Sequence, residues 1–425
     1  MLVYCEHKNN RIEYAFRSFF ETETEEIVFF TSDENEFRNS KESKLNYSDK
    51  NFDSILQVVP HDLLFEEGIK IREIKIEKWN DTYCFFKTSG GEIPFDVFAA
   101  AFWLMSRYEE YVSYEPDQHS RYSGKNALLF KNNLLLRPLA DEWRNNICQK
   151  LGIHHKTKKI ARTLTIDVDN AFAFAHKSFI RNSGGSFRNL IKGDYRQISD
   201  RRKVRSGKMN DPFDTYDYIL DTVQKNNTGI KFFFLLADRA KNDTNLSHLI
   251  PKFRDKIKEI SEKAECGIHP SYQSFLHKEK VQEEIFRLEN ITGKKVQISR
   301  QHFLRMKLPE SYQVLIDCGI TEDHTMGFAD EPGYRAGTSK PFLWYDLKNE
   351  KTSNLKVCPF VMMDATLKRY LNLSPEKAIL YSKEVFETIR NTGGQFTLLW
   401  HNESVNDYWK WEGWKKVFEA QMSLV

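Results

Sequence analysis

Polar and apolar residues alternate strictly along residues 163–170, which read TLTIDVDN. A period of two is typical of a half-buried strand, with its polar side chains on one face and its apolar side chains on the other. Asp167 and Asp169 therefore share one face at the end of this strand. Two such carboxylates repel each other unless a cation lies between them or they serve different functions. The pattern equally fits a strand that ends in a turn with both aspartates in solvent.

From residue 159 onward, strand and helix patterns alternate along the chain. We expect strands at residues 160–166, 230–236, 265–268, 296–299, 319–322, 357–362 and 396–400. We expect helices at residues 212–226, 246–263, 278–292 and 375–391. Repeated βα units predict a parallel sheet, and a length of about 265 residues suits a closed or distorted (β/α) barrel. The expected barrel domain spans residues 159–425.

Residues 1–158 lack this alternation and are predicted to form a separate, smaller α+β domain. Strand patterns lie at residues 26–31 and 69–78, and helix patterns at residues 94–111 and 141–151. This part of the sequence carries no recognisable catalytic pattern, so its role is left open.

Composition narrows the function classes. With 425 residues and 40% hydrophobic residues the chain can bury a large core, and a net charge of +3 argues against a nucleic-acid binder. The six cysteines include no C-x-x-C pair, which favours reduced thiols in a cytoplasmic protein. The start of the chain lacks a signal-peptide pattern, and the longest apolar run, residues 97–105, is too short to span a bilayer.

Chemically active side chains gather at the expected carboxyl ends of the strands, where active sites of such barrels lie. These side chains are Asp167, Asp169, His269, Arg300, His302, Asp323, Asp364 and His401. Any one of them could be an ordinary structural residue. Together they predict an active site, because a solvated rim more often carries Gly, Ser and Asn.

The motifs around these residues resemble those of the polysaccharide deacetylase family (carbohydrate esterase family 4) over residues 160–402. The stretch TIDVD, residues 165–169, is similar to the family's first motif, in which some members space the two acids as D-x-D. The sequence HPSYQ, residues 269–273, matches H-[ST]-x-x-H in part, with Gln273 in place of the second histidine. RQHF, residues 300–303, keeps only the arginine of R-x-P-Y, and LLWH, residues 398–401, matches L-x-x-H.

The resemblance implies a metal-dependent hydrolase on a distorted barrel, of a subgroup with an extra N-terminal domain. It makes Asp167 the base, Arg300 its orienting partner and His401 the acid, and it implies Asp169 and His269 as ligands of a divalent metal. We expect zinc, with cobalt, nickel or manganese as alternatives. His302 is a candidate replacement ligand for the missing histidine, and without it metal binding would be weak or absent. The expected substrate contacts are Phe303, Asp323, Arg335 and Trp400.

A helical turn after His269 would bring positions 269 and 273 to one face.

The expected substrate is an N- or O-acetylated carbohydrate. One alternative is a degenerate barrel that binds sugar without hydrolysis, and another is a glycosyltransferase whose D-x-D holds Mn²⁺.

Residues 176–211 carry ten Lys or Arg and three Asp. This segment is either a solvated insertion or an electropositive lid for an anionic or phosphate-linked glycan.

Overall fold

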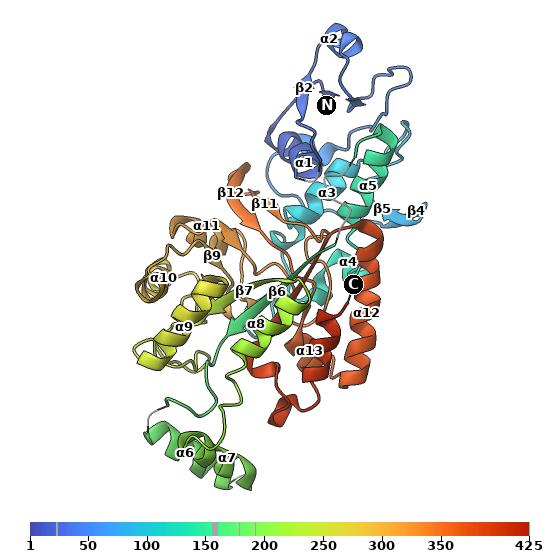
Figure 1. Ribbon diagram of the computed structural model, residues 1–425. Coiled ribbons are helices and arrows are strands. Elements are labelled where there is room, and N and C mark those ends of the chain that lie inside the picture. Colours follow the sequence, from blue (N-terminus) through green and yellow to red (C-terminus); the bar gives the residue numbers. More distant parts are fainter. Residues whose placement is uncertain (23, 155–159, 178, 192, 425) are drawn as a thin grey trace.

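The structure is a computed structural model that describes residues 1–22, 24–154, 160–177, 179–191 and 193–424. The predicted domain boundary at residues 158 and 159 lies outside this described part. Figure 1 shows an elongated molecule, with most of residues 1–154 (called the first half of the chain below) at one end and a large sheet with its helices in the middle.

The first half of the chain combines a small sheet with several helices. Its strands are β1 (Leu2–Tyr4), β2 (Phe29–Thr31), β3 (Lys44–Asn46), β4 (Glu77–Trp79) and β5 (Thr82–Cys84). The order β2-β1-β3 forms a parallel sheet, and β4 and β5 form an antiparallel hairpin. The α-helices are α1 (Asn10–Phe20), α2 (Glu34–Asn39), α3 (Val97–Met105), α4 (Leu128–Lys131) and α5 (Leu139–Leu151). Every residue of α3 is buried, which agrees with its unbroken apolar sequence.

The second half is built on one nine-stranded sheet of order β11-β12-β10-β9-β8-β7-β6-β14-β13. Its strands are β6 (Ala161–Val168), β7 (Gly229–Phe234), β8 (Glu265–Ile268), β9 (Ile298–Ser299), β10 (Glu322–Asp323), β11 (Phe342–Asp346), β12 (Lys351–Val357), β13 (Met362–Met363) and β14 (Gln395–His401). All neighbouring strands are parallel except β11, which pairs antiparallel with β12. The sheet is therefore mixed, with a parallel centre in which consecutive strand ends meet at one edge.

Strands β12 and β13 are two parts of one extended segment that contacts both ends of the parallel run. β12 pairs with β10, and β13 pairs with β14. Between them, the Phe360 amide donates to the Met326 carbonyl at 3.1 Å, and the Val361 amide donates to the Thr397 carbonyl at 3.0 Å. This segment thereby joins the β10 side of the sheet to the β14 side.

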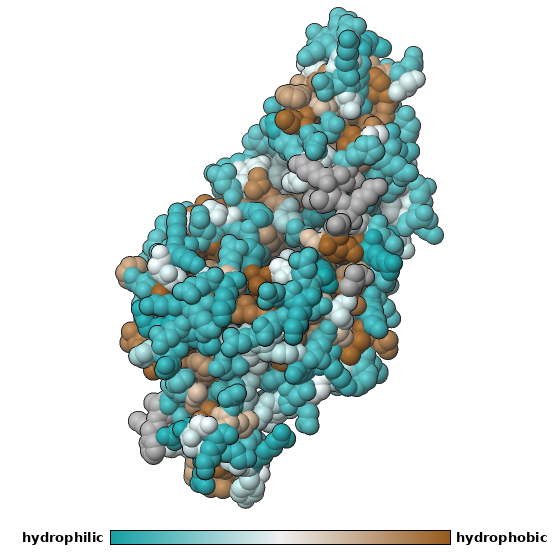
Figure 2. Space-filling view, in the orientation of Figure 1, coloured by the Kyte–Doolittle hydropathy of each residue, from teal (hydrophilic) through white to brown (hydrophobic). Residues whose placement is uncertain are grey.

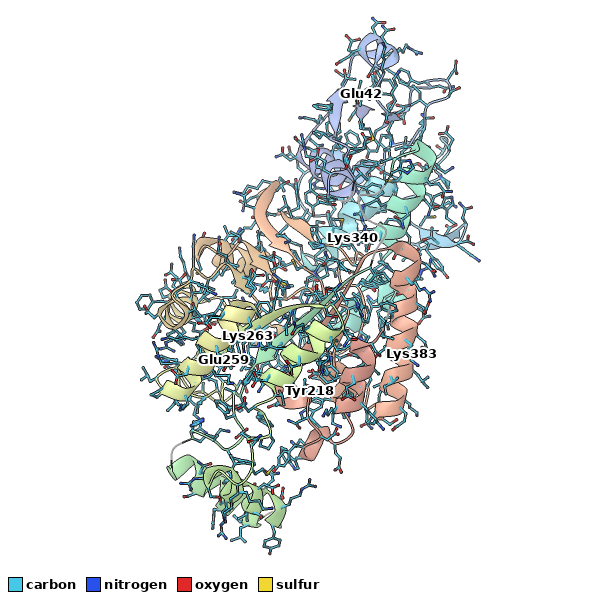
Figure 3. All side chains as sticks on the ribbon, viewed as in Figure 1. Glu42, Tyr218, Glu259, Lys263, Lys340 and Lys383 are labelled. Carbon is cyan, nitrogen blue, oxygen red and sulfur yellow. The ribbon has the colours of Figure 1, made fainter. Side chains whose placement is uncertain are left out.

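Helices flank this sheet on the outside (Figure 1). They are α8 (Tyr216–Lys225), α9 (Pro251–Lys263), α10 (Lys278–Thr292), α11 (Glu310–Asp317), α12 (Pro375–Thr392) and α13 (Lys415–Met422). Local sequence sets their ends: Ser374 caps α12, and Gly293 adopts the left-handed conformation after α10. On their exposed sides, Glu259 and Lys263 of α9 form an ion pair of 2.9 Å, and Tyr218 of α8 donates to Glu419 of α13 at 2.6 Å (Figure 3).

The two halves share one hydrophobic core, whose buried members include Phe16, Phe98, Ile166 and Trp344. Polar contacts cross the same boundary. Arg335 pairs with Glu110 through two hydrogen bonds of 2.8 and 2.6 Å, and both side chains are buried. Buried ion pairs of this kind are costly to break, because the remaining charge loses its partner.

Several predicted elements differ from the structure. Residues 358–361 are not a strand, so the expected strand at 357–362 is wrong; Pro359 interrupts it between β12 and β13. The expected strand at 69–78 is reduced to β4, and the helix at 94–111 ends at Met105. The segment 176–211 contains two helices, α6 (Phe179–Ile191) and α7 (Tyr195–Arg205), although residues 178 and 192 lie outside the described part. Among the described residues, no helix combines the length and apolar character needed to cross a membrane.

Candidate active site

Side chains from the carboxyl ends of four strands meet in one cleft. β6 supplies Asp167 and the following Asp169, β8 leads to His269, β9 leads to His302, and β14 ends with His401. These strands are parallel and adjacent, so their ends lie at the same edge of the sheet. The sequence prediction that their terminal residues come together therefore corresponds to the observed arrangement.

Asp169, His269 and His302 offer ligand atoms that all lie within 4.8 Å of one another. His269 Nε2 is 3.3 Å from Asp169 Oδ1, and His302 Nε2 is 3.5 Å from Asp169 Oδ2. Two imidazole nitrogens and a carboxylate are a common ligand set for zinc and related divalent ions, with a further position left for water or substrate.

Hydrogen bonds at the other ring nitrogen orient both histidines. His269 Nδ1 lies 2.5 Å from the Arg300 carbonyl oxygen, which can only accept, so this nitrogen carries the proton. His302 Nδ1 lies 2.9 Å from the carboxylate of Asp243. Burial raises the pKa of Asp243, but hydrogen bonds from His302 and from backbone N–H groups lower it below its usual value. The other ring nitrogen of each histidine, Nε2, faces Asp169. Such hydrogen bonds at the far nitrogen are typical of metal-binding histidines.

The electrostatics of the trio favour a positive charge between its members. Burial raises the pKa of Asp169, but His302, His269 and His401 outweigh this effect and hold it well below its usual range. Burial likewise opposes a charge on His302, yet Asp169 and Asp243 raise its pKa to about 9. Asp169 Oδ1 is buried and has no hydrogen-bond partner. A divalent cation would satisfy this oxygen, so the residues present fit a metal ion.

Asp167 lies beside the trio and is held by a buried arginine. Arg300 Nη1 donates to Asp167 Oδ1 at 3.0 Å and Thr165 Oγ1 accepts from the same nitrogen at 2.7 Å, while Arg300 Nε donates to the His324 carbonyl. Asp167 Oδ2 faces His269 Nε2 at 3.7 Å. Burial lowers the pKa of Arg300, and the negative charge of Asp167 counteracts this effect. One carboxylate oxygen is thus fixed by Arg300, and the other is directed into the cleft.

His401 enters the cleft from β14 and is paired with Asp364. Its Nδ1 lies 2.9 Å from Asp364 Oδ1, and its backbone N–H donates to Asp364 Oδ2 at 2.9 Å. Burial opposes protonation of the ring, but Asp364 and the more distant Asp169 and Asp167 raise the pKa of His401 to about 10. The ring is therefore protonated near neutral pH, with Nε2 3.9 Å from Asp169 Oδ2.

The cleft has a volume of about 320 Å³ and receives residues from both halves of the chain. Its lining consists of Gln118, Arg121, Asp167, Asp169, His269, His302, Phe303, Leu304, Met363, Ala365, Arg369, Tyr370, His401 and Glu403. Arg121 donates to the Phe303 carbonyl at 2.8 Å and to the Tyr370 hydroxyl at 3.0 Å. Phe303 has a φ of +61°, an uncommon conformation for a bulky residue, and Arg121 helps to hold it.

Not all predicted site residues line this cleft. Phe303 does, whereas Asp323, Arg335 and Trp400 are buried elsewhere. Asp323 accepts hydrogen bonds from Ser299 and Thr325, and the Trp400 indole donates to Gln421. The expected helical turn after His269 is wrong: residues 269–271 belong to no helix or turn, the assigned turn residues are 273–276, and the Tyr272 and Gln273 amides donate to Asp243. The Gln273 side chain is exposed and outside the cleft.

Sequence analysis missed Asp243, Gln118 and Arg121. Asp243 lies in the long connection between β7 and α9 rather than at a strand end, and it is fully buried. Gln118 and Arg121 lie 40 or more positions before β6 in the sequence. No local pattern marks these three residues, since their partners are distant in sequence.

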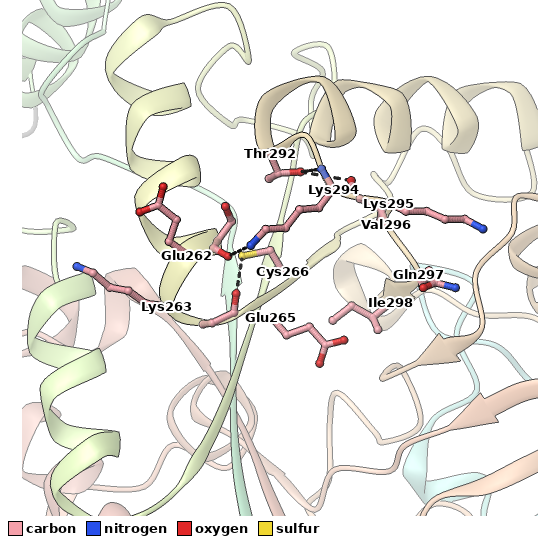
Figure 4. A pocket seen from close by; sticks show the side chains of 12 residues that line it. Glu262, Lys263, Glu265, Cys266, Thr292, Lys294, Lys295, Val296, Gln297 and Ile298 are labelled. Atoms are coloured by element: carbon pink, nitrogen blue, oxygen red, sulfur yellow. Dashed lines mark hydrogen bonds between the residues drawn. The ribbon is translucent and has the colours of Figure 1, made fainter.

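Two other polar features lie outside the cleft. Glu322, His324 and Cys358 form a second group with metal-ligand spacing, but Lys231 and Lys356 pair with Glu322 at 3.1 and 2.6 Å and supply its positive charge. A hollow of about 460 Å³ opens at the amino ends of β8 and β9, where Cys266 and Lys294 bond to backbone carbonyls (Figure 4). Neither feature combines an acid, a base and open ligand atoms.

Comparison with known proteins gives a family match for residues 1–156 and distant structural matches over part of the chain. Residues 1–156 match a family of unknown function, DUF7033. No curated protein matches the chain. A structure from Mycobacterium smegmatis assigned to the polysaccharide deacetylases is 14% identical, with a TM-score of 0.40, and the match covers 63% of this chain and 86% of that one.

Two further solved structures are similar at the same low level. The polysaccharide deacetylase from Bacillus cereus is 13% identical, with a TM-score of 0.31, and the match covers 62% of this chain and 86% of that one. A CE4 family pseudoenzyme from Bacillus anthracis is 12% identical, with a TM-score of 0.29, and 61% of each chain is covered. With such low scores, the inference of function rests on the residues of the cleft.

Proposed function

We propose that this protein is a metal-dependent hydrolase that removes acetyl groups from an N- or O-acetylated carbohydrate. The observation that carries the proposal is the convergence of three ligand-type side chains, an arginine-held carboxylate and a protonated histidine in one cleft. We further infer that the sheet closes as a distorted barrel through the segment of β12 and β13, and that residues 1–158 form the domain that supplies the outer wall of the cleft.

Asp169, His269 and His302 would hold the metal ion, which is zinc in this proposal, with cobalt, nickel or manganese as alternatives. When bound, such an ion activates water and polarises the acetyl carbonyl as a Lewis acid. His302 replaces the second histidine ligand of the motif, at whose position this sequence has Gln273. Asp243 orients His302, as the Arg300 carbonyl orients His269.

The remaining steps belong to Asp167, Arg300 and His401. Asp167 Oδ2 takes a proton from the attacking water, while Arg300 holds the carboxylate in place through Oδ1. The water oxygen bonds to the acetyl carbon, and the bond from this carbon to the sugar nitrogen or oxygen breaks. His401 Nε2 donates a proton to the leaving amine or alcohol, and Asp364 stabilises the charged ring before the transfer. Phe303 and Tyr370 provide the wall against which the sugar lies.

The metal assignment is tested by titrating the metal-stripped protein with Co²⁺ and following the visible absorption. The wild type binds one equivalent, and Asp169→Asn and His302→Ala lose this binding. Asp243→Asn weakens it by about 10- to 100-fold, as expected for a partner of a ligand. Gln273→Ala is the matched control and leaves it unchanged, because Gln273 is exposed outside the cleft. Equal Co²⁺ affinity of the wild type and His302→Ala would contradict the assignment.

A second candidate function is carbohydrate binding without hydrolysis. It is favoured by the replacement of one motif histidine by Gln273 and by the loss of the proline and tyrosine around Phe303. In that case a wild type without Co²⁺ affinity still binds acetylated oligosaccharides and releases no acetate.

A further inference from the structure

Helices α6 and α7 form an arm that projects from the rest of the molecule below α8 (Figure 1). The base of the arm is packed. Phe174 and Tyr408 form a small apolar cluster with Val204 and Met209, and the Tyr408 hydroxyl donates to Asp200 at 3.3 Å. The arm is therefore a structured part of the protein, with a fixed base and a free end.

The free end exposes a group of large apolar side chains. Phe187, Leu190, Ile191 and Tyr195 are 65%, 52%, 71% and 68% exposed. The first three lie at positions i, i+3 and i+4 of α6, so they share one face, and Tyr195 begins α7. Single exposed apolar residues are common on protein surfaces, but a group of this kind usually marks a contact with a partner or a membrane.

Exposed basic side chains of α7 and the residues after it lie beside this apolar end. The segment 176–211 contains ten Lys or Arg, three Asp and no Glu. The three aspartates have structural roles or are buried: Asp194 caps α7, Asp200 is buried, and Asp211 accepts hydrogen bonds from the backbone of residues 173–175. Arg196 and Lys203 approach Asp200 only at 3.9 and 3.6 Å and have side chains 69% and 54% exposed. The outer surface of the arm thus carries a net positive charge.

A hollow of about 570 Å³ on the arm combines both kinds of side chain. Leu190, Tyr195 and Ile198 line its apolar side, and the exposed Arg202, Lys203 and Lys208 line its basic side. In Figure 2 hydrophobic and hydrophilic residues lie next to each other over this lower end of the molecule. An apolar surface next to the three cationic side chains can bind a molecule that has both an apolar part and an anionic part.

We propose that the α6–α7 arm docks the protein on an anionic membrane surface. The apolar end enters the boundary between headgroups and acyl chains, and the basic residues contact lipid phosphates. A soluble anionic glycan would account for the basic residues alone, but not for four exposed apolar side chains between them. This inference goes beyond the proposed hydrolase and does not depend on it.

The test is co-sedimentation of the full chain with lipid vesicles. The protein binds vesicles of phosphatidylcholine mixed with phosphatidylglycerol, binds phosphatidylcholine alone far more weakly, and is released by salt. The variant Leu190→Ser/Ile191→Ser/Tyr195→Ser loses binding. The variant Arg202→Glu/Lys203→Glu/Lys208→Glu weakens it by at least about 10²-fold. The matched control Leu249→Ser/Phe286→Ser/Leu380→Ser removes side chains 70%, 62% and 60% exposed on other elements and leaves binding unchanged.

Circular dichroism and Co²⁺ binding show whether each variant is folded. The proposal is overturned if the wild type does not bind the anionic vesicles, if it binds neutral vesicles equally well, or if the control variant loses as much binding. It is also overturned if the apolar variant only converts a dimer into monomers, which would identify a second copy of the chain as the occupant. Binding of a sulfated glycan that the apolar variant retains, without vesicle binding, would instead identify a glycan surface.

Discussion

Three histidines in the cleft follow one arrangement, in which Nδ1 is bonded to an acceptor and Nε2 faces the centre. The acceptors differ: a backbone carbonyl for His269, Asp243 for His302 and Asp364 for His401. His269 and His302 lie closer to Asp169 than His401 does. Position and hydrogen bonding are the basis on which we propose His269 and His302 as metal ligands and His401 as the proton donor.

The role of His401 leads to a prediction on turnover. His401→Ala lowers kcat on an acetamide substrate by about 10²- to 10⁴-fold and changes KM little, because a general acid acts mainly in the transition state. Steady-state kinetics on an amide and on an ester with a good leaving group measure this effect.

The ester is the internal control, since a good leaving group needs little protonation and its rate falls much less. An unchanged rate on the amide would remove His401 from the mechanism. A proportional rise in KM with unchanged kcat would assign it to substrate binding instead.

At the level of single residues, sequence indicated the strand-end groups but not their partners. Asp167, Asp169, His269, His302 and His401 stand at the ends of strands with clear patterns, so chemistry and position point the same way. Asp243 and Arg121 reach the site from a long connection and from the other half of the chain. Their roles depend on three-dimensional contacts that no local period encodes.

At the level of elements, prediction succeeded where a pattern was long and its ends were marked. β8 and α10 have the expected bounds, and α12 begins after Ser374 as expected. β11 and most of β12, which form a hairpin, were missed, and the single strand expected at 357–362 spans Pro359, which separates the end of β12 from the two-residue β13. A two-residue strand such as β13 has no detectable period and is fixed by its neighbour β14.

Glu322 on β10 gives a prediction on stability. It faces Lys231 at 3.1 Å, Lys356 at 2.6 Å and His324 at 2.7 Å, and its side chain is only 14% exposed. Burial raises the pKa of Glu322, but His324, Lys356 and Lys231 hold it far below its ordinary value of 4.5. Glu322→Gln removes an acidic partner from both Lys356 and Lys231, of which Lys231 keeps the exposed Glu265, and it lowers the free energy of unfolding at pH 7 by about 3 kcal/mol.

The pH dependence has a defined sign. Because the pKa of Glu322 is lower in the folded state, its contribution is present above pH 4.5 and is lost as the pH falls below this value. Denaturant unfolding at pH 7 and at pH values below 4.5 should therefore show a shrinking difference between wild type and Glu322→Gln. Glu265→Gln is the matched control, because Glu265 contacts the same Lys231 but is 53% exposed, and it costs less than about 1 kcal/mol. A difference that is independent of pH would contradict this account.

At the level of the whole molecule, the first half of the chain takes part in the cleft. Gln118 and Arg121 line it, and Arg305 donates to the His119 carbonyl from the other side. The shared core and the buried Arg335–Glu110 pair hold the two halves together. The first half thus contributes part of the wall of the cleft.

Arg121→Gln tests this contribution. It removes the charged donor to Phe303 and Tyr370, so we expect kcat/KM to fall at least about tenfold while Co²⁺ affinity stays the same. Arg72→Gln is the control, an arginine of the same half that pairs with Asp62 and Glu66 outside the cleft. Equal kinetics for both variants would show that the first half does not shape the site.

The most direct test of the central claim is acetate release from N- and O-acetylated oligosaccharides as Zn²⁺ is added to the metal-stripped protein. The account predicts no release without metal and a rise that saturates at one equivalent. It also predicts no release from Asp167→Asn, although this variant binds the ion, because Asp167 is the base and not a ligand. Release by the stripped wild type, or no release by the metal-loaded wild type from any of these substrates, would contradict it.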